Sequence, residues 1–195
     1  MFTGIIAAVG RIERVAPRAQ GRRLAIDADR LDLSDVAIGD SIAVNGCCLT
    51  VIALRGVGFE VDVSQATIDS TVGLDAPGAV NLEKSLRLAD RLDGHLVSGH
   101  VDGVGAVVAF DPVGESTRLV VAAPRGLARY LARKGSIAVQ GVSLTINRVD
   151  GAEFEANLIP HTLAATTLGQ LRPGAKVNLE VDLLARYVER LFGAS

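Results

Sequence analysis

The feature that most constrains the fold of this chain is an internal repeat. Residues 41–51, Ser-Ile-Ala-Val-Asn-Gly-Cys-Cys-Leu-Thr-Val, return at an offset of 95 as residues 136–146, Ser-Ile-Ala-Val-Gln-Gly-Val-Ser-Leu-Thr-Ile, with seven of eleven positions identical. The same offset aligns Gly10 with Gly105, Leu24 with Leu119 and Phe59-Glu60 with Phe154-Glu155. Such a constant register predicts two homologous domains, which we place at residues 1–95 and 96–182.

Each half has the pattern of a series of short strands. Residues 59–63 and 154–158 alternate apolar and polar side chains, and Gly-Asp, Asp-Gly and Pro-Gly pairs cut the sequence into runs of strand length. A small half with about six strands protects its sheet edges best by closing into a barrel. The sequence therefore predicts an all-β chain of two tandem antiparallel barrels, packed closely because no Pro- or Ser-rich linker separates them.

Helical signals are scarce. Residues 31–36 and 124–133 each suggest a short helix at the same place in the repeat. Residues 183–195 follow the last strand, and five apolar residues among them share one side at helical spacing: Leu183, Leu184, Tyr187, Val188 and Leu191. We predict a C-terminal helix whose apolar side packs against a neighbouring subunit.

Composition and charge exclude several classes of function. Twenty Lys and Arg against 22 Asp and Glu give a net charge of −2 with no basic stripe, so nucleic acid is not an expected partner. The apolar start of the chain lacks the basic stretch and cleavage pattern of a signal peptide, and we expect no membrane span. The two cysteines are adjacent, which strains a mutual disulfide and favours reduced thiols in a cytoplasmic protein.

Comparison of the two copies separates core positions from candidate site positions. Cys47 is replaced by Val142 in the second copy, whereas Cys48 is replaced by Ser143, a small polar residue. By the period of two, Thr50 shares the face of Cys48 and Thr145 that of Ser143. A glycine bulge with satisfied hydroxyl groups explains one such group of polar residues, but its presence in both copies favours a ligand pocket in each.

The histidines and one acidic residue leave alternatives open. His95, His100 and His161 match no common zinc spacing, so we expect no metal, and each fits a backbone-bonded loop residue as well as a site residue. Asp182 precedes the C-terminal helix and fits a helix N-cap as well as a functional role.

Seven blocks, in order and spread over nearly the whole chain, resemble the riboflavin synthase family of the alpha-subunit type. They are Met1-Phe-Thr-Gly-Ile-Ile6, Val44-Asn-Gly-Cys-Cys-Leu-Thr50, Gly94-His-Leu-Val-Ser-Gly-His-Val-Asp-Gly103, Lys134-Gly135, Gly141-Val-Ser-Leu-Thr145, Ile159-Pro-His-Thr162 and Val177-Asn-Leu-Glu-Val-Asp182. The resemblance implies two six-stranded Greek-key barrels plus a C-terminal α-helix, assembled as a homotrimer. It also leaves lumazine synthase open as a further partner.

The same resemblance implies the reaction. Each barrel would bind one 6,7-dimethyl-8-ribityllumazine, so that two molecules meet in each active site. One would give a four-carbon unit to the other, yielding riboflavin and 5-amino-6-ribitylaminouracil without a metal or redox cofactor.

Site residues are expected from both halves. The catalytic set is Phe2, Cys48, His100, Ser143, Thr145 and Asp182, with Cys48 as nucleophile or proton relay and Asp182 orienting a proton-transfer group. In the first pocket, with Phe2, Thr3 and Gly4 as its lid, the expected substrate contacts are Thr3, Gly4, Ile5, Ile6, Ser41, Leu49, Thr50, Asp62, Val63, Ser64, Gln65, Ala66 and Thr67. In the second pocket they are Gly99, Val101, Lys134, Leu144, Asn157, Leu158, Ile159, Pro160, His161 and Thr162.

The chain departs from the family pattern at three places. Gln65 and Ala66 stand where Pro and Glu are expected, and Gln140 where Asp or Asn is expected. We expect the missing acid at position 66 to weaken a ribityl contact in the first pocket. A non-catalytic lumazine- or flavin-binding antenna protein and a structural tandem-barrel module are the alternatives, but the intact polar residues in both copies favour the enzyme.

Overall fold

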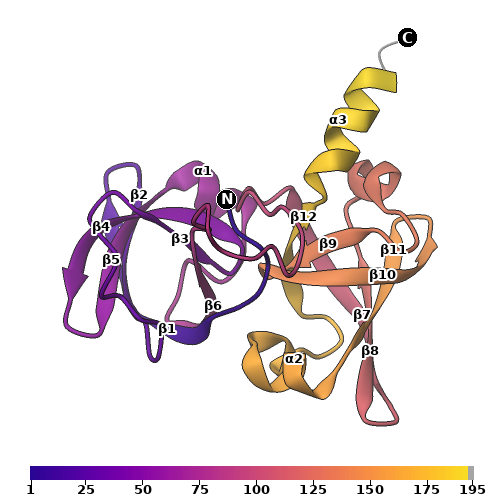
Figure 1. The fold of residues 1–195 in the computed structure, drawn as a ribbon, viewed down its shortest axis with the longest axis horizontal. Helices are drawn as coiled ribbons and strands as arrows, with labels where there is room; N and C mark the ends of the chain where they lie inside the picture. Colours follow the sequence, from indigo (N-terminus) through magenta and orange to yellow (C-terminus); the bar gives the residue numbers. More distant parts are fainter. Residues whose placement is uncertain (193–195) are drawn as a thin grey trace.

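Two closed antiparallel barrels lie side by side in the computed structural model, which describes residues 1–192 (Figure 1). The first consists of β1 (Ala8–Arg18), β2 (Gly21–Asp27), β3 (Ser41–Val44), β4 (Cys47–Arg55), β5 (Gly58–Ser64) and β6 (Gly78–Lys84). The second consists of β7 (Gly103–Val113), β8 (Ser116–Ala122), β9 (Ser136–Val139), β10 (Val142–Asp150), β11 (Glu153–Leu158) and β12 (Lys176–Val181). Both have the same cyclic strand order, β1-β2-β5-β4-β3-β6 and β7-β8-β11-β10-β9-β12, which confirms the predicted all-β fold.

Tight hairpins set the register of the strands that carry the repeated motif. Asn45 and Gly46 join β3 to β4 with φ values of 48° and 80°, as a two-residue type I′ turn requires. Gln140 and Gly141 form the same turn between β9 and β10, with φ values of 50° and 80°. The two turns therefore share one geometry although one carries Asn and the other Gln.

These two turns meet where the barrels touch. A Cβ on Gly46 would lie 2.7 Å from the backbone nitrogen of Gly141, so a larger residue cannot occupy this position without a shift. The side-chain amide of Asn178 also crosses the interface and donates to the backbone oxygen of Asn45 at 3.1 Å. The barrels thus pack directly against each other, as the absence of a linker predicts.

The short helices differ from the sequence prediction. Residues 31–36 form turns rather than a helix, because the Asp32 carboxylate accepts a hydrogen bond from the Ser34 amide and closes a local turn instead. Of residues 124–133, only η1 (Arg125–Tyr130) is helical, as a 3₁₀-helix. The sequence reasoning missed α1 (Gln65–Ser70), α2 (Pro160–Ala165) and η2 (Thr167–Gln170), which are too short to show an apolar stripe.

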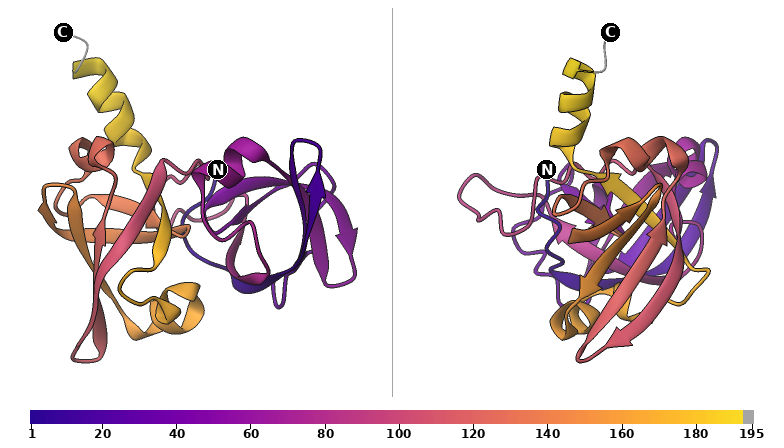
Figure 2. Two further views of the ribbon diagram at one scale, coloured as in Figure 1. Left: turned by 180° about the vertical axis from the view of Figure 1, so that it is seen from behind. Right: turned by 90° about the vertical axis from the view of Figure 1, so that its right-hand side faces the viewer.

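The C-terminal helix α3 (Leu183–Phe192) projects away from both barrels (Figure 2). Glu189 fixes its direction by accepting hydrogen bonds from Arg129 (2.6 Å) and Tyr130 (2.8 Å) of η1. The opposite side is exposed and apolar, with Leu184, Tyr187, Val188 and Leu191 each more than half accessible. The last three residues of the predicted helical segment, 193–195, lie outside the described residues. No helix within residues 1–192 is long and apolar enough to cross a membrane.

Candidate functional site

Successive residues of β4 face opposite sides of the barrel wall. Cys47 lies in the first core, and its burial raises the pKa of the thiol to about 12, so this sulfur stays protonated. Cys48 is half-buried and Thr50 exposed on the outer face. Ser143 and Thr145 of β10 have the same outward placement. The division of faces inferred from the two copies is therefore confirmed.

The hydrogen-bonded ladder stops beside both pairs of polar residues. Pairing between β4 and β5 runs from Arg55–Gly58 only as far as Val51–Val61, so the stretch from Cys48 to Thr50 has no partner in β5. In the second barrel, pairing between β10 and β11 likewise ends at Ile146–Ala156. In each closed barrel, one ladder thus ends next to the outward thiol or hydroxyl, which leaves strand backbone there without a partner in the adjoining strand.

The segment before each barrel crosses to the other barrel. The Ser143 amide donates to the Gly4 oxygen, and the Cys48 amide donates to the Gly99 oxygen, both at 2.8 Å. We call residues 2–4 the first arm and residues 97–99 the second arm. The two arms meet where Phe2 and Val97 form a β-bridge, and the Phe2 ring is fully buried there.

The crossing brings the arms to the opposite barrels from those at which the sequence predicts them. Gly4 of the first arm lies at Ser143, and Ile6 packs against the second core. Gly99 lies at Cys48, and Val101 packs against the first core. The repeat aligns each arm with its own half but carries no information about the barrel on which the arm packs.

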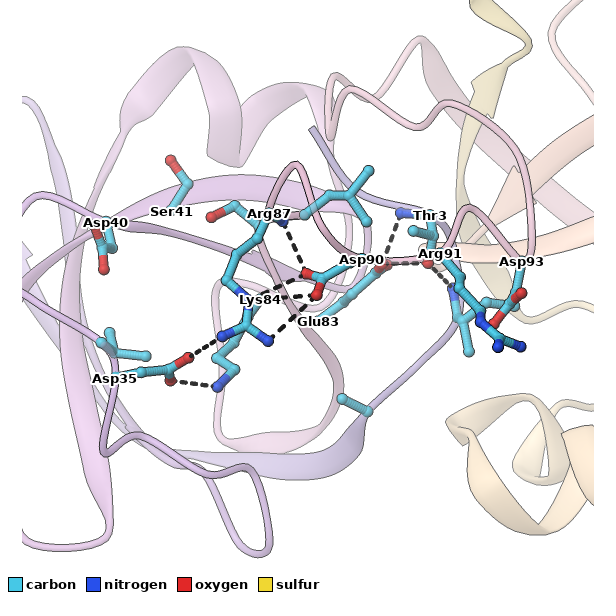
Figure 3. Close-up of a pocket in the computed structure, with 15 residues that line it drawn as sticks. Thr3, Asp35, Asp40, Ser41, Glu83, Lys84, Arg87, Asp90, Arg91 and Asp93 are labelled. Atoms are coloured by element: carbon cyan, nitrogen blue, oxygen red, sulfur yellow. Dashed lines mark hydrogen bonds and ion pairs between the residues drawn. The ribbon is translucent and has the colours of Figure 1, made fainter.

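Two buried glutamates hold the arms, and the sequence reasoning did not single them out. Glu83 accepts hydrogen bonds from the Thr3 amide (2.6 Å), the Thr3 hydroxyl (2.6 Å) and the Gly4 amide (3.0 Å). Figure 3 shows Glu83 beside Thr3. Burial raises the pKa of Glu83, although these donors oppose the shift. The signal available was the repeated Val-Asn-Leu-Glu of residues 80–83 and 177–180.

Glu180 makes the same contacts in the second half. Its carboxylate accepts from the Ser98 amide and hydroxyl, both at 2.6 Å, and from the amides of Gly99 and His100 at 2.9 Å. The His100 side chain itself is exposed, as is that of His161.

His95, whose role the sequence leaves open, contacts the outward hydroxyl of the second barrel. Its Nδ1 lies 2.7 Å from the Ser143 hydroxyl, and its Nε2 has no hydrogen-bond partner among the residues that the structure describes. Burial lowers the pKa of His95, while Asp182 and Glu180 raise it by a smaller amount. At neutral pH this lowered pKa favours a neutral His95 imidazole beside the Ser143 hydroxyl. Asp182 also accepts from the Leu184 amide at 3.0 Å, as a helix cap does.

The remaining expected contacts are of three kinds. Four have side chains inside the barrels, so only their backbone can reach a ligand: Leu49, Val63, Leu144 and Leu158. Others lie at the ends of β5 and β11 and in the short helices that follow: Asp62, Ser64, Gln65, Ala66 and Thr67 in the first half, and Asn157, Ile159, Pro160, His161 and Thr162 in the second. Lys134 is exposed in the loop before β9, with a φ of 68°.

Asp62, an expected contact, and Gln140, a departure from the family pattern, are both fixed by contacts within the protein. Arg23 donates two 2.7 Å hydrogen bonds to Asp62, and this contact lowers the pKa of the carboxyl group. The side-chain oxygen of Gln140 accepts a hydrogen bond from the backbone amide of Asn178 at 3.0 Å. The side-chain oxygen of Asn45 accepts in the same way from the backbone amide of Asn81 at 2.8 Å. Gln140 therefore makes the same kind of turn hydrogen bond as Asn45, although the family pattern has Asp or Asn at position 140.

Residues of the first half of the chain border two separate hollows. A cavity of about 460 Å³ is lined by Thr3, Ile5 and Ser41 together with a charged rim that includes Asp35, Lys84 and Arg87 (Figure 3). A hollow of about 630 Å³ is lined by residues 18–23 and by Asp62, Val63 and Ser64. Cys48 and Thr50 line neither of the two. Residues 1–192 contain no group of three or more His, Cys, Asp or Glu placed to hold a metal ion.

Comparisons with known proteins match both halves. A family model described as the lumazine binding domain matches residues 3–85 and 98–182. The riboflavin synthase of Photobacterium phosphoreum is 45% identical over 193 residues, covering 98% of this chain and 88% of the relative. That of Brucella abortus (strain 2308) is 43% identical over 198 residues, covering 98% of each. The crystal structure of LumP complexed with 6,7-dimethyl-8-(1'-D-ribityl) lumazine superposes with a TM-score of 0.82 at 26% identity, covering 93% of this chain and 99% of that one.

Proposed function

The chain belongs to the riboflavin synthase family of lumazine-binding proteins, and we propose that it makes riboflavin from two molecules of 6,7-dimethyl-8-ribityllumazine. One lumazine gives a four-carbon unit to the other, and the products are riboflavin and 5-amino-6-ribitylaminouracil. The protein is an enzyme, and the transfer of a carbon unit makes it a transferase. Lumazine is its small-molecule ligand.

The observation that carries this proposal is a pair of related but unequal sites in one chain. Each site combines an interrupted ladder, an outward thiol or hydroxyl, and an arm from the other half. The Ser143 hydroxyl contacts the imidazole of His95, whereas the first site has a thiol, Cys48, at the equivalent position. A reaction in which two identical molecules take different roles needs two such sites, and bringing the two reactants together supplies much of the rate enhancement.

The two outward groups receive different roles in this proposal. Cys48 acts as a nucleophile or proton relay at the first site, where its own backbone amide donates to the Gly99 oxygen and fixes the strand. Ser143 moves a proton at the second site, because a neutral His95 can accept one from its hydroxyl. Asp182 caps α3 and favours the protonated form of His95, which suits a positioning role. Phe2 holds the crossing point of the arms beside Cys48.

We infer that the enzyme assembles as a homotrimer in the cytoplasm, with lumazine synthase as a further candidate partner. Residues 1–95 and 96–182 serve as the lumazine-binding domains and residues 183–195 as the trimerisation segment. The support is the apolar side of α3, on which Leu184, Tyr187, Val188 and Leu191 are exposed. In a trimer the first barrel of one subunit can face the second barrel of the next, so that each reacting pair lies between subunits.

A non-catalytic antenna protein is not favoured. The relatives that match at 43–45% identity over nearly the whole chain are named riboflavin synthase, whereas the LumP structures match at 26–27%. Both outward groups are also in place.

The direct test is to incubate the purified protein with the lumazine and follow riboflavin fluorescence. We expect riboflavin and the pyrimidine product in equal amounts, without added nucleotide and unchanged by a chelator. Tight lumazine binding with no riboflavin would support the antenna protein. Activity that is lost with a chelator and restored by zinc would contradict the proposed chemistry.

A further inference from the structure

Each buried glutamate belongs to one barrel but holds an arm that ends on the other. Glu83 lies in β6 of the first barrel and binds the Thr3 and Gly4 amides, while the Gly4 oxygen accepts from Ser143 of the second barrel. Glu180 lies in β12 of the second barrel and binds Ser98 and Gly99, while the Gly99 oxygen accepts from Cys48 of the first. Each glutamate thus connects through an arm to the outward residue of the other barrel, and we call each such series of contacts a relay. One relay runs from the first barrel to the second, and the other runs from the second to the first.

The arms depend on these carboxylates for their position. Thr3 and Gly4 are buried and outside any strand, so their amide groups need an acceptor, and both oxygens of Glu83 supply one. Hydrogen bonds from amides to a carboxylate are short and strong. On the far side of each arm there is little freedom, since a Cβ on Gly4 would lie 2.6 Å from the Ser143 Cβ and one on Gly99 would lie 2.6 Å from the Cys48 Cβ.

We infer that Glu83 and Glu180 are positioning residues that act across the barrel interface: Glu83 sets the site at Ser143, and Glu180 sets the site at Cys48. The description of these places as substrate sites rests on the proposed function. The relay itself rests only on the contacts above. It follows that each half of the repeat controls the geometry of the other half's site, so the two sites of one chain are coupled.

Amide hydrogen exchange tests the relay without substrate. The Cys48 and Ser143 amides report the two arm contacts directly, because each donates to an arm oxygen. We expect Glu180→Gln to accelerate exchange of the Cys48 amide at least tenfold and that of Ser143 less than twofold. Glu83→Gln should give the opposite pattern. The variants are matched controls for one another, since each replaces the same residue at the equivalent place of the repeat.

Glu60→Gln controls for the loss of a buried carboxylate as such. Glu60 is 2% exposed in the first barrel but pairs with Arg14 and Arg55 rather than with an arm, so neither amide should respond selectively. If a glutamate variant fails to fold, Thr3→Ala and Ser98→Ala remove the hydroxyl contact to each carboxylate and should give the same crossed pattern at smaller size. Thr3→Ala also removes the acceptor of the Ile5 amide, so Ser98→Ala is the cleaner of the two.

Two outcomes would overturn the inference. One is equal acceleration of both amides in both variants, which indicates general loss of stability. The other is acceleration confined to the barrel that contains the substitution. Riboflavin formation in the same samples separates this result from the proposed function: a crossed exchange pattern without any riboflavin from the wild-type protein would leave the relay standing and contradict the enzyme.

Discussion

Cys47 and Cys48 are neighbours in the sequence with opposite environments. One thiol is part of a barrel core and the other faces outward under the second arm. The sequence predicts this division, because the second copy replaces one by Val and the other by Ser. It does not predict that His95 lies at the Ser143 hydroxyl or that Glu180 binds the arm beside Cys48, because both contacts depend on how the two halves pack. The sequence therefore predicts which side of the barrel wall a residue faces, but not which residues from the other half contact it.

The two cysteines should therefore differ in their effect on turnover. We expect Cys48→Ala to lower the rate of riboflavin formation on the order of 10²-fold, the size typical of a lost proton-transfer group. Cys47→Val should change it less than about twofold, since Val142 fills the equivalent core position. Steady-state rates at equal folded yield measure the difference. The reverse ranking would show that the inner thiol carries the chemistry.

Acid should destabilise the protein in part through His95. Its pKa is lowered in the folded state, so the unfolded chain binds the proton first as the pH falls. The stabilisation that depends on neutral His95 is complete above the ordinary histidine pKa of about 6.5 and is lost as the pH drops below it. Urea unfolding of wild type and His95→Gln between pH 7.5 and 5 measures this. The free energy of unfolding should fall less steeply in the variant; identical slopes would contradict a neutral buried imidazole.

The elements of the site are strand ends and short helices rather than a continuous wall. The alternation of residues 59–63 predicts β5, and the structure adds that its ladder to β4 ends at Val51–Val61. The following helix α1 has six residues and no buried side chain, so it leaves no periodic signal. Its start is set by Ser64, whose hydroxyl accepts from the Thr67 amide at 3.1 Å. The sequence thus predicts the strands but not the interruption that makes a site.

Helix α3 should be needed for assembly but not for the barrels. It contacts the second barrel mainly through polar pairs such as Tyr130–Glu189, while its apolar side is exposed. A chain truncated before Leu183 should stay folded with an unchanged strand signal in circular dichroism and should sediment as a monomer. A milder variant, Leu184→Glu with Val188→Glu, should give the same result. A truncated protein that still sediments as a trimer would contradict this role.

At the scale of the whole molecule, two barrels are joined by exchanged arms and by two turns in direct contact. The repeat predicts the two barrels and their closeness. The sequence predicts each arm at the barrel that follows it, whereas in the structure the Gly4 and Gly99 oxygens each accept a hydrogen bond from the other barrel. Prediction and structure differ in how the halves pack. A tandem repeat specifies the strands of each half, but not which barrel each arm contacts.

Close contact of the turns can be tested with a matched pair of glycines. Gly39 and Gly46 both have positive φ, but a Cβ on Gly39 would meet nothing within 4 Å, whereas one on Gly46 would lie 2.7 Å from the Gly141 nitrogen. We expect Gly46→Ala to lower the free energy of unfolding by about 1–3 kcal/mol more than Gly39→Ala, the usual cost of overpacking. Equal losses in thermal or urea unfolding would mean that the barrels do not depend on this contact.

Complementation between inactive variants tests the central claim, that two unequal sites act on one pair of lumazines between subunits. One variant lacks the first site's outward groups (Cys48→Ala with Thr50→Val) and the other those of the second (Ser143→Ala with Thr145→Val). Each is unfolded and refolded alone or together with the other, and riboflavin formation is measured after mixed trimers are confirmed by mass. Mixed trimers contain interfaces in which an intact first site faces an intact second site, so we predict activity well above the average of the two variants alone. Activity no higher than that average would place the reacting pair within one chain and contradict the account.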